Sequence, residues 1–229
     1  MKPLPVLSCL CFIGAPKVSG MSKKVMDLVA YWAGVYDNTL QTKQPGDTHD
    51  LVQVRLVPVD IDCFRQNPVI FVEEASNGVI RDFDLVEVTD GIEDTVSLAF
   101  YTFANQSNYK PREFNAESLS NMSCGAFHRV QNCTASYKVA NGYAYGNYPE
   151  CKYAVGGKHP RYTTMHRCDS VTATLPQNTG QTSPIEPYEF LYSEKLQVIN
   201  PPKGYVAPCG SKLDSSTNVT NHYASSARR

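Results

Sequence analysis

The 229-residue sequence has few charges and no block of charge. Asp, Glu, Lys and Arg make up only 19% of the residues, and the formal net charge is -1. Because Lys and Arg are spread along the chain, nucleic acid is not expected as a partner, and no acidic run suggests a cation-binding tail. The main apolar run, Leu4 to Ala15, is shorter than the roughly 20 residues of a membrane-spanning helix. No membrane span is therefore expected.

Motifs for metal, redox and phosphate chemistry are also missing. The sequence contains no Cys-x-x-Cys pair, which argues against a zinc or thioredoxin-like site. The five histidines form no pair at the spacing of metal ligands. Gly156-Gly157-Lys158 lacks the strand-to-helix context of a phosphate loop. We therefore expect no metal and no required cofactor, and the sequence identifies no catalytic residue.

The first 20 residues, MKPLPVLSCLCFIGAPKVSG, predict a signal peptide that is cleaved near Gly20, because one Lys precedes an apolar run that ends in small residues. Six cysteines follow this leader and are expected to form disulfides: Cys63, Cys124, Cys133, Cys151, Cys168 and Cys209. N-glycosylation is expected at Asn105, Asn121, Asn132 and Asn218. Together these features predict a secreted glycoprotein. The alternative is a cytoplasmic protein with buried free cysteines, and the pairing of the cysteines stays open.

Only one segment, residues 21–32, has a strong helical pattern. Val25, Leu28, Val29 and Trp32 form one apolar stripe there, and Ser22 can cap the helix. Most of the remaining chain consists of short segments typical of β-strands, separated by turns. Beyond a hairpin within residues 69–89, strands are expected at 50–59, 95–103, 126–130, 135–139, 143–146, 162–175 and 188–198. We predict one all-β domain over residues 21–210, an antiparallel meander that closes into a barrel, and a disordered polar tail over 211–229.

The hairpin segment VIFVEEASNGVIRDFDL, residues 69–85, contains an Asn77-Gly78 turn. A two-residue type I′ turn at this point places Glu74 opposite Arg81 and Glu73 opposite Asp82. Strand alternation then predicts an apolar inner face that carries Val72, Glu74, Arg81 and Phe83, and an outer face that exposes Glu73 and Asp82 to solvent.

An inward-facing Glu74–Arg81 pair has two interpretations. In the first, the Arg81 guanidinium binds a ligand carboxylate and Glu74 orients it. In the second, both side chains lie at a wet rim of the barrel and extend to water. A turn of another length would exchange the two faces of the hairpin.

Several segments, in this order, resemble the CpcT/CpeT family of phycobiliprotein (bilin) lyases. LVAYWAGVYDNTLQ places Gly34, Tyr36, Asn38 and Gln41 in that family's Gly-x-aromatic-x-Asn-x-x-Gln pattern. IFVEEA and VIRDFDLVEVTD resemble its Glu-Gln and Tyr-Arg-x-Arg strands, with Glu74 and Phe83 in place of the Gln and the second Arg. SCGAFHRV, YAYGNYPECK and IEPYEFLY resemble its Gly-Cys strand, its Phe-x-Gly…Cys hairpin and its closing strand. The resemblance extends over about residues 25 to 195.

The resemblance implies a calycin-like antiparallel β-barrel with one N-terminal helix and a central cavity. It also implies that the barrel binds a small hydrophobic, carboxylated ligand such as a linear tetrapyrrole (a bilin). If the chain is an enzyme, it would be a bilin lyase with an acceptor protein as partner. The residues expected to contact the ligand are Arg81, Glu74, Phe83, Val72, Trp32, Tyr36, Tyr188 and Phe190. The alternative is a secreted structural, matrix or defence protein that keeps the fold without lyase activity.

Overall fold

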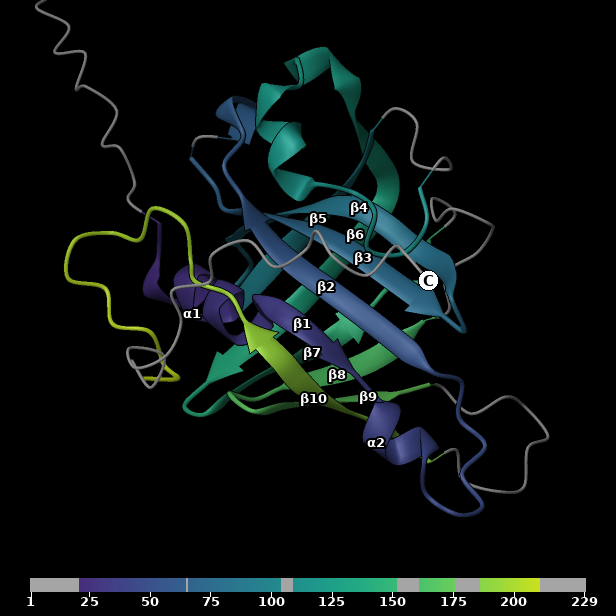
Figure 1. Cartoon of the computed structure of the whole chain (residues 1–229). Coiled ribbons are helices and arrows are strands. Elements are labelled where there is room, and N and C mark those ends of the chain that lie inside the picture. The colour runs from purple at the N-terminus through teal and green to yellow at the C-terminus, as the bar shows by residue number, and fades with distance from the viewer. Residues whose placement is uncertain (1–20, 65, 104–108, 152–160, 176–185, 211–229) are drawn as a thin grey trace, which may run out of the picture.

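A computed structural model describes residues 21–64, 66–103, 109–151, 161–175 and 186–210. The predicted leader and polar tail lie outside these residues. The elements in chain order (Figure 1) are α1 Lys23–Trp32, β1 Gly34–Asp37, α2 Thr39–Thr42, β2 Val52–Val59, η1 Asp62–Phe64, β3 Val69–Ser76, β4 Val79–Asp90, β5 Thr95–Phe103, η3 Ala116–Asn121, η4 Cys124–Ala126, β6 Phe127–Ala140, β7 Tyr143–Tyr148, β8 Tyr162–His166, β9 Ser170–Thr174 and β10 Tyr188–Lys195.

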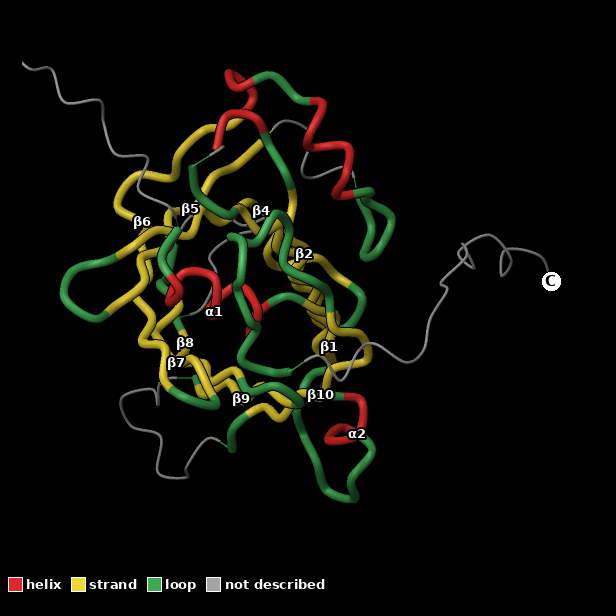
Figure 2. The backbone as a smooth tube through the Cα atoms, turned by 90° about the vertical axis from the view of Figure 1, so that its left-hand side faces the viewer, coloured by secondary structure: helices red, strands yellow, loops and turns green. Residues whose placement is uncertain are grey.

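The strands form a closed antiparallel barrel. From β2 to β10 each strand pairs with the next one in sequence, and β1 pairs with both β2 and β10. Closure gives both edges of the meander a partner, so the ring of strands is continuous (Figure 2). The predicted all-β barrel with one N-terminal helix is therefore confirmed.

Several predicted strands end a few residues away from their observed ends, and in two places the division of the chain into strands differs from the prediction. The expected strands at 126–130 and 135–139 are one strand, β6, in which Asn132 adopts a positive φ of 57° beside an irregularity in the pairing with β5. The expected strand at 162–175 is two strands, because the chain turns at Cys168 and the Arg167 N–H donates to the Ser170 carbonyl at 2.8 Å.

Helix α1 lies within the ring of strands near one end of the barrel (Figure 2). Ser22 caps it as predicted, since its Oγ accepts a hydrogen bond from the Val25 N–H at 3.3 Å. The helix contacts β4, β5, β6 and β7, and every residue from Val25 to Trp32 is buried. It therefore forms part of the barrel core. Among the described residues, no helix is both long and apolar enough to cross a bilayer.

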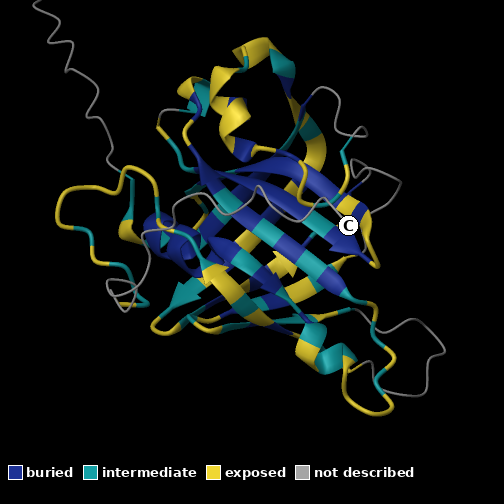
Figure 3. Cartoon of the chain, viewed as in Figure 1, coloured by how far each residue is buried: buried dark blue, intermediate teal, exposed yellow. Residues whose placement is uncertain are grey.

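A second apolar layer covers the outer face of β3 and β4. Residues 109–126, with η3 and η4, fold over these strands at the top of Figure 1, and the strands beneath them are buried in Figure 3. Phe71 of β3 and Phe83 of β4 each pack against Phe114, with ring centroids 5.2 Å apart. The sequence did not predict this layer, which gives the barrel wall a core on both sides.

All six cysteines predicted to form disulfides do so. Cys63–Cys124 joins η1 to η4 and so fastens the outer layer. Cys133–Cys151 is buried and joins β6 to the chain after β7. Cys168–Cys209 joins the turn between β8 and β9 to the C-terminal segment, residues 196–210.

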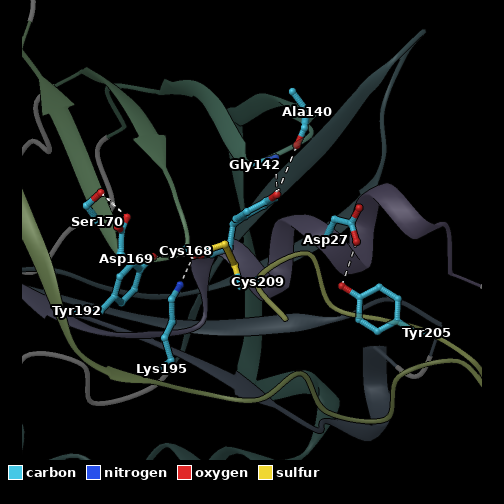
Figure 4. Close-up of a disulfide and its surroundings, with 11 residues drawn as sticks. Asp27, Ala140, Gly142, Cys168, Asp169, Ser170, Tyr192, Lys195, Tyr205 and Cys209 are labelled. Carbon is cyan, nitrogen blue, oxygen red and sulfur yellow. Dashed lines mark hydrogen bonds between the residues drawn. A yellow bond between two sulfur atoms is a disulfide. The ribbon is translucent and has the colours of Figure 1, made fainter. Parts of the chain in front are cut away.

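Figure 4 shows how this C-terminal segment and β10 hold α1 in place. The Tyr31 carbonyl lies in the last turn of α1 and accepts hydrogen bonds from the Tyr192 hydroxyl at 2.6 Å and from Lys195 Nζ at 2.9 Å. These donors satisfy a carbonyl for which the helix itself has no partner. Tyr205 donates to Asp27 Oδ1 at 3.1 Å, close to the Cys168–Cys209 disulfide. The segment therefore closes the α1 end of the barrel.

Candidate functional site in the barrel interior

The β3–β4 hairpin differs from its prediction by one residue. The turn itself is as expected, because Ser76 pairs with Val79 and both Asn77 and Gly78 have positive φ. One step further, the pairing shifts, so that Glu74 lies opposite Asp82 and not opposite Arg81. Arg81 is the extra residue of a β-bulge, and a bulge exchanges the two faces of the strand beyond it.

The bulge reverses the predicted orientation of β4. Arg81 is exposed, and Phe83 packs in the outer aromatic layer, so the prediction that both share the inner face with Glu74 is wrong. Asp82 was expected to face solvent but is fully buried on the inner side, and so is Asp84. Val72 faces the barrel core as predicted.

Glu73 points outward, as predicted, but does not reach solvent. It is buried beneath the outer layer, where Arg55 Nη1 lies 3.0 Å from its Oε2 and the Arg112 N–H donates to its Oε1 at 2.8 Å. A buried carboxylate needs such partners to offset the loss of hydration. Glu73 is therefore part of the structure of the outer layer.

Two carboxylates and two tyrosines meet inside the barrel. Glu74 and Asp82 are opposed residues of β3 and β4. From β7 and β8, Tyr148 donates to Asp82 Oδ2 at 2.7 Å and Tyr162 donates to Glu74 Oε2 at 3.4 Å. The two rings stack, with centroids 4.9 Å apart and planes at 8°. Phenol donors and carboxylate acceptors thus join strands that are distant in the sheet, and we call these four residues the carboxylate–tyrosine cluster.

The phenols of Tyr36 and Tyr162 remain protonated over the ordinary pH range, because the pKa of each is raised. Burial, followed by the nearby charges of Glu74 and Asp82, raises the pKa of Tyr162 well above its usual value. Burial also raises the pKa of Tyr36, and the neighbouring Tyr192 and Glu74 add to the effect. The hydroxyls of Tyr36 and Tyr162 can therefore donate hydrogen bonds but cannot act as bases.

Tyr36 lies in the same lateral row of side chains as the carboxylates. It is paired with Val54, which is paired with Glu74, which is paired with Asp82, so the four residues cross β1 to β4 in one line. Its ring contacts Phe190, with centroids 5.6 Å apart. Two residues expected to contact a ligand, Tyr36 and Phe190, thus lie together in the interior.

Trp32 and His166 bring two further polar atoms into the core. Their ring centroids are 5.3 Å apart, and both side chains are at most 2% exposed. Within the described residues, neither Trp32 Nε1 nor His166 Nδ1 has a hydrogen-bond partner. Burial lowers the pKa of His166 to about 3, aided by the charge of Lys195, so the imidazole is neutral at physiological pH. A buried polar atom without a partner is costly in a purely structural core.

Sequence reasoning missed Asp82, Tyr148, Tyr162 and His166. Alternation within β8 places Thr164 and His166 on the buried face, and this pattern is present in the sequence. What the pattern lacks is any sign that β7 and β8 face β3 and β4 across the barrel.

The end of the barrel opposite α1 is built by residues of the Gly-x-aromatic-x-Asn-x-x-Gln pattern. Asn38 accepts from the Val52 N–H at 2.7 Å and donates to the Asp50 carbonyl at 2.9 Å. Gln41 donates to the Pro187 carbonyl and accepts from the Glu189 N–H. The Asn38 side chain thus attaches the segment that contains α2 to the start of β2, and the Gln41 side chain attaches it to the start of β10. The role of both side chains in this structure is architectural.

His49 lies at the same end and joins two loops. Nδ1 is 2.9 Å from Asp47 Oδ2 and Nε2 is 3.1 Å from the Glu186 carbonyl, beside Tyr188, one of the predicted ligand residues. Both partners are acceptors, so both contacts require the doubly protonated imidazolium. Burial alone lowers the pKa of His49, but the Glu186 and Asp47 hydrogen bonds outweigh it and raise the pKa.

We expect this contact to stabilise the protein in acid and not in base. A raised folded-state pKa gives stability that is complete below the unfolded value of about 6.5 and is lost as pH rises through the folded value. Thermal melting at about pH 5 and about pH 9 should therefore show His49→Gln melting below the wild type by a larger margin at the acid pH. His128→Gln, at an exposed histidine, is the control and should show no such difference. An equal margin at both values would contradict the assignment.

The predicted glycosylation sites are accessible where they are described. Asn121 is the last residue of η3, and Asn132 lies at the irregularity of β6, and both are exposed. Asn105 and Asn218 lie outside the described residues.

No protein-family model matches the sequence, and a search of curated proteins finds no relative. The resemblance to bilin lyases therefore rests on the sequence segments alone.

Proposed function

We propose that the protein binds a small, flat, conjugated ligand inside the barrel. The observation that carries this proposal is the carboxylate–tyrosine cluster, which lies in a core of aromatic rings next to polar atoms of Trp32 and His166 that lack hydrogen bonds among the described residues. A core that served stability alone would favour apolar side chains at these positions. Convergent polar groups within an aromatic enclosure are typical of small-molecule sites.

The chemistry of these groups suggests the ligand class. Carboxylates accept hydrogen bonds from N–H groups, and the aromatic rings of Tyr36 and Phe190 can pack on a conjugated plane. A linear tetrapyrrole offers both N–H donors and such a plane, which agrees with the resemblance. The anchor differs from the one expected from sequence: Glu74 and Asp82 take the place of Arg81.

Biliverdin titration tests this proposal, with Trp32 as a reporter because it is the only tryptophan of the chain. Binding in the barrel should quench Trp32 fluorescence and shift the absorbance band of biliverdin. Asp82→Asn should weaken binding about ten-fold or more, since it replaces a charge-assisted hydrogen bond by a neutral one. Arg81→Ala is the matched control on the adjacent residue and should change the affinity by less than about two-fold.

The possible results of this titration distinguish bilin binding, the identity of the anchoring residues and lyase activity. Absence of quenching and of a band shift would reject a bilin ligand and favour the structural, matrix or defence role. Loss of binding in Arg81→Ala with retention in Asp82→Asn would reject the carboxylate anchor. Transfer of the bilin to a cysteine of an acceptor protein, stable to acid and urea, would add lyase activity to binding.

The proposal includes an extracellular location. Three disulfides fit an oxidising compartment, in which such bonds persist. The leader and the exposed sequons Asn121 and Asn132 support the same location.

A further inference from the structure

A row of small polar side chains crosses the outside of the barrel. The pairing register places residues side by side on six consecutive strands, β4 to β9. We call this row the hydroxyl–amide ladder, and it consists of Thr89, Ser97, Ser136, Asn147, Thr163 and Thr174.

The ladder faces away from the core along its whole length. Its neighbours within the strands, among them Val88, Leu98 and Tyr137, belong to the inner apolar cluster, so alternation directs the ladder outward. Thr89 and Ser97 are half-buried, and the other four members are exposed. Strands lie about 4.8 Å apart, which makes the row about 24 Å long.

Two tyrosines stand beside the ladder on β7. Tyr143 and Tyr145 alternate with the buried Ala144 and therefore share the outer face with Asn147. Their ring centroids are 5.9 Å apart, and Tyr145 is 37% exposed. An exposed aromatic ring offers an apolar plane with a polar hydroxyl at its edge.

The centre of the ladder has hydrogen-bonding capacity that the protein does not use. Thr163 donates to Asn147 Oδ1 at 2.7 Å, and Asn147 Nδ2 makes no hydrogen bond with a described residue. Both N–H groups of this amide can thus be offered to a ligand. Asn is also unfavourable in strands, so its position in the middle of a sheet is not explained by β-propensity.

We propose that this face, the ladder with Tyr143 and Tyr145, binds a neutral polysaccharide. Sugar rings present C–H faces that stack on aromatic planes and hydroxyl edges that exchange hydrogen bonds with Ser, Thr and Asn. None of the six ladder residues carries a charge, and Lys138, which is paired with Tyr145, adds one cation beside them, whereas an anionic polymer would call for a row of Lys or Arg. The extended row matches a chain-like ligand better than a compact one. This inference is independent of the bilin proposal, because it uses the opposite side of the barrel wall.

Retention of the full chain on insoluble polysaccharides tests the proposal. Microcrystalline cellulose, chitin and starch granules are the neutral probes, and alginate gel is the anionic one. We expect retention on at least one neutral probe and none on alginate. Tyr145→Ala and the double variant Asn147→Ala/Thr163→Ala should each lower the affinity about ten-fold, as loss of a central contact does. Leu191→Ala, an exposed outward-facing residue of β10 outside the ladder, should leave retention unchanged.

Trp32 fluorescence confirms that each variant is folded, since all the substituted side chains are on the outside of the barrel. Retention on none of the neutral probes would overturn the proposal. Retention on alginate alone, or retention that Tyr145→Ala and the double variant leave unchanged, would overturn it as well. None of these outcomes affects biliverdin binding, so the two proposals succeed or fail separately.

Discussion

Replacing Phe83 with alanine is expected to lower the free energy of unfolding by about 3–5 kcal/mol, the usual cost of removing a buried phenylalanine. The Phe83 side chain is 1% exposed and contacts Phe71, Phe103 and Phe114 in the outer layer. The cavity that it leaves has no flexible side chain nearby to fill it, because its neighbours are mainly rigid rings. Urea unfolding followed by circular dichroism measures this change.

The same variant tests on which side of the barrel wall Phe83 lies. Because Phe83 is outside, Phe83→Ala should leave biliverdin binding unchanged under folding conditions. Arg81→Ala is the control two residues away and should change stability by less than about 0.5 kcal/mol. A small stability loss together with weakened biliverdin binding would place Phe83 inside the barrel and contradict the bulge.

Replacing Cys63 and Cys124 together with alanine is expected to cost about 4 kcal/mol. The two cysteines are 61 residues apart, so their disulfide removes much conformational freedom from the unfolded chain. It also holds η4 against η1 and thereby keeps the outer layer on β3 and β4. Urea unfolding of the double variant against the wild type, both oxidised, measures the loss.

Cys133–Cys151 supplies the comparison for this prediction. These residues are 18 apart, so the same argument gives a smaller loss of about 3 kcal/mol. We further expect that Phe83→Ala and the Cys63/Cys124 replacement together cost less than their sum, because both loosen one layer. Strict additivity would mean that the disulfide does not support the outer aromatic cluster.

Local features of the sequence predicted much of the barrel. The Ser22 cap, the Asn77-Gly78 turn and the alternation of β2 depend on neighbours in the chain, and each lies where it was expected. Trp32 lies in the core as the last residue of the apolar stripe predicted for the helix. These predictions hold because capping, turn geometry and strand alternation are determined within a few residues.

The register of the β3–β4 hairpin could not be predicted from neighbouring residues. Nothing adjacent to Arg81 distinguishes a regular ladder from one with an extra residue, since both faces of β4 carry apolar side chains. The bulge is favoured by the outer layer, which takes up Phe83 and Leu85, and by Tyr148, which reaches Asp82 from the far side of the barrel. One inserted residue then decides which charges face the core.

By itself the sequence determined most of the strands, the N-terminal helix, the hairpin turn and which cysteines form disulfides. Only the tertiary structure decided the pairing of those cysteines, the outer layer and the composition of the interior. The reason is physical: Glu74, Asp82, Tyr148 and Tyr162 come from four strands, and their proximity depends on the register and closure of the barrel. The inner charges of this protein are thus the carboxylates of Glu74 and Asp82, and Arg81 lies outside.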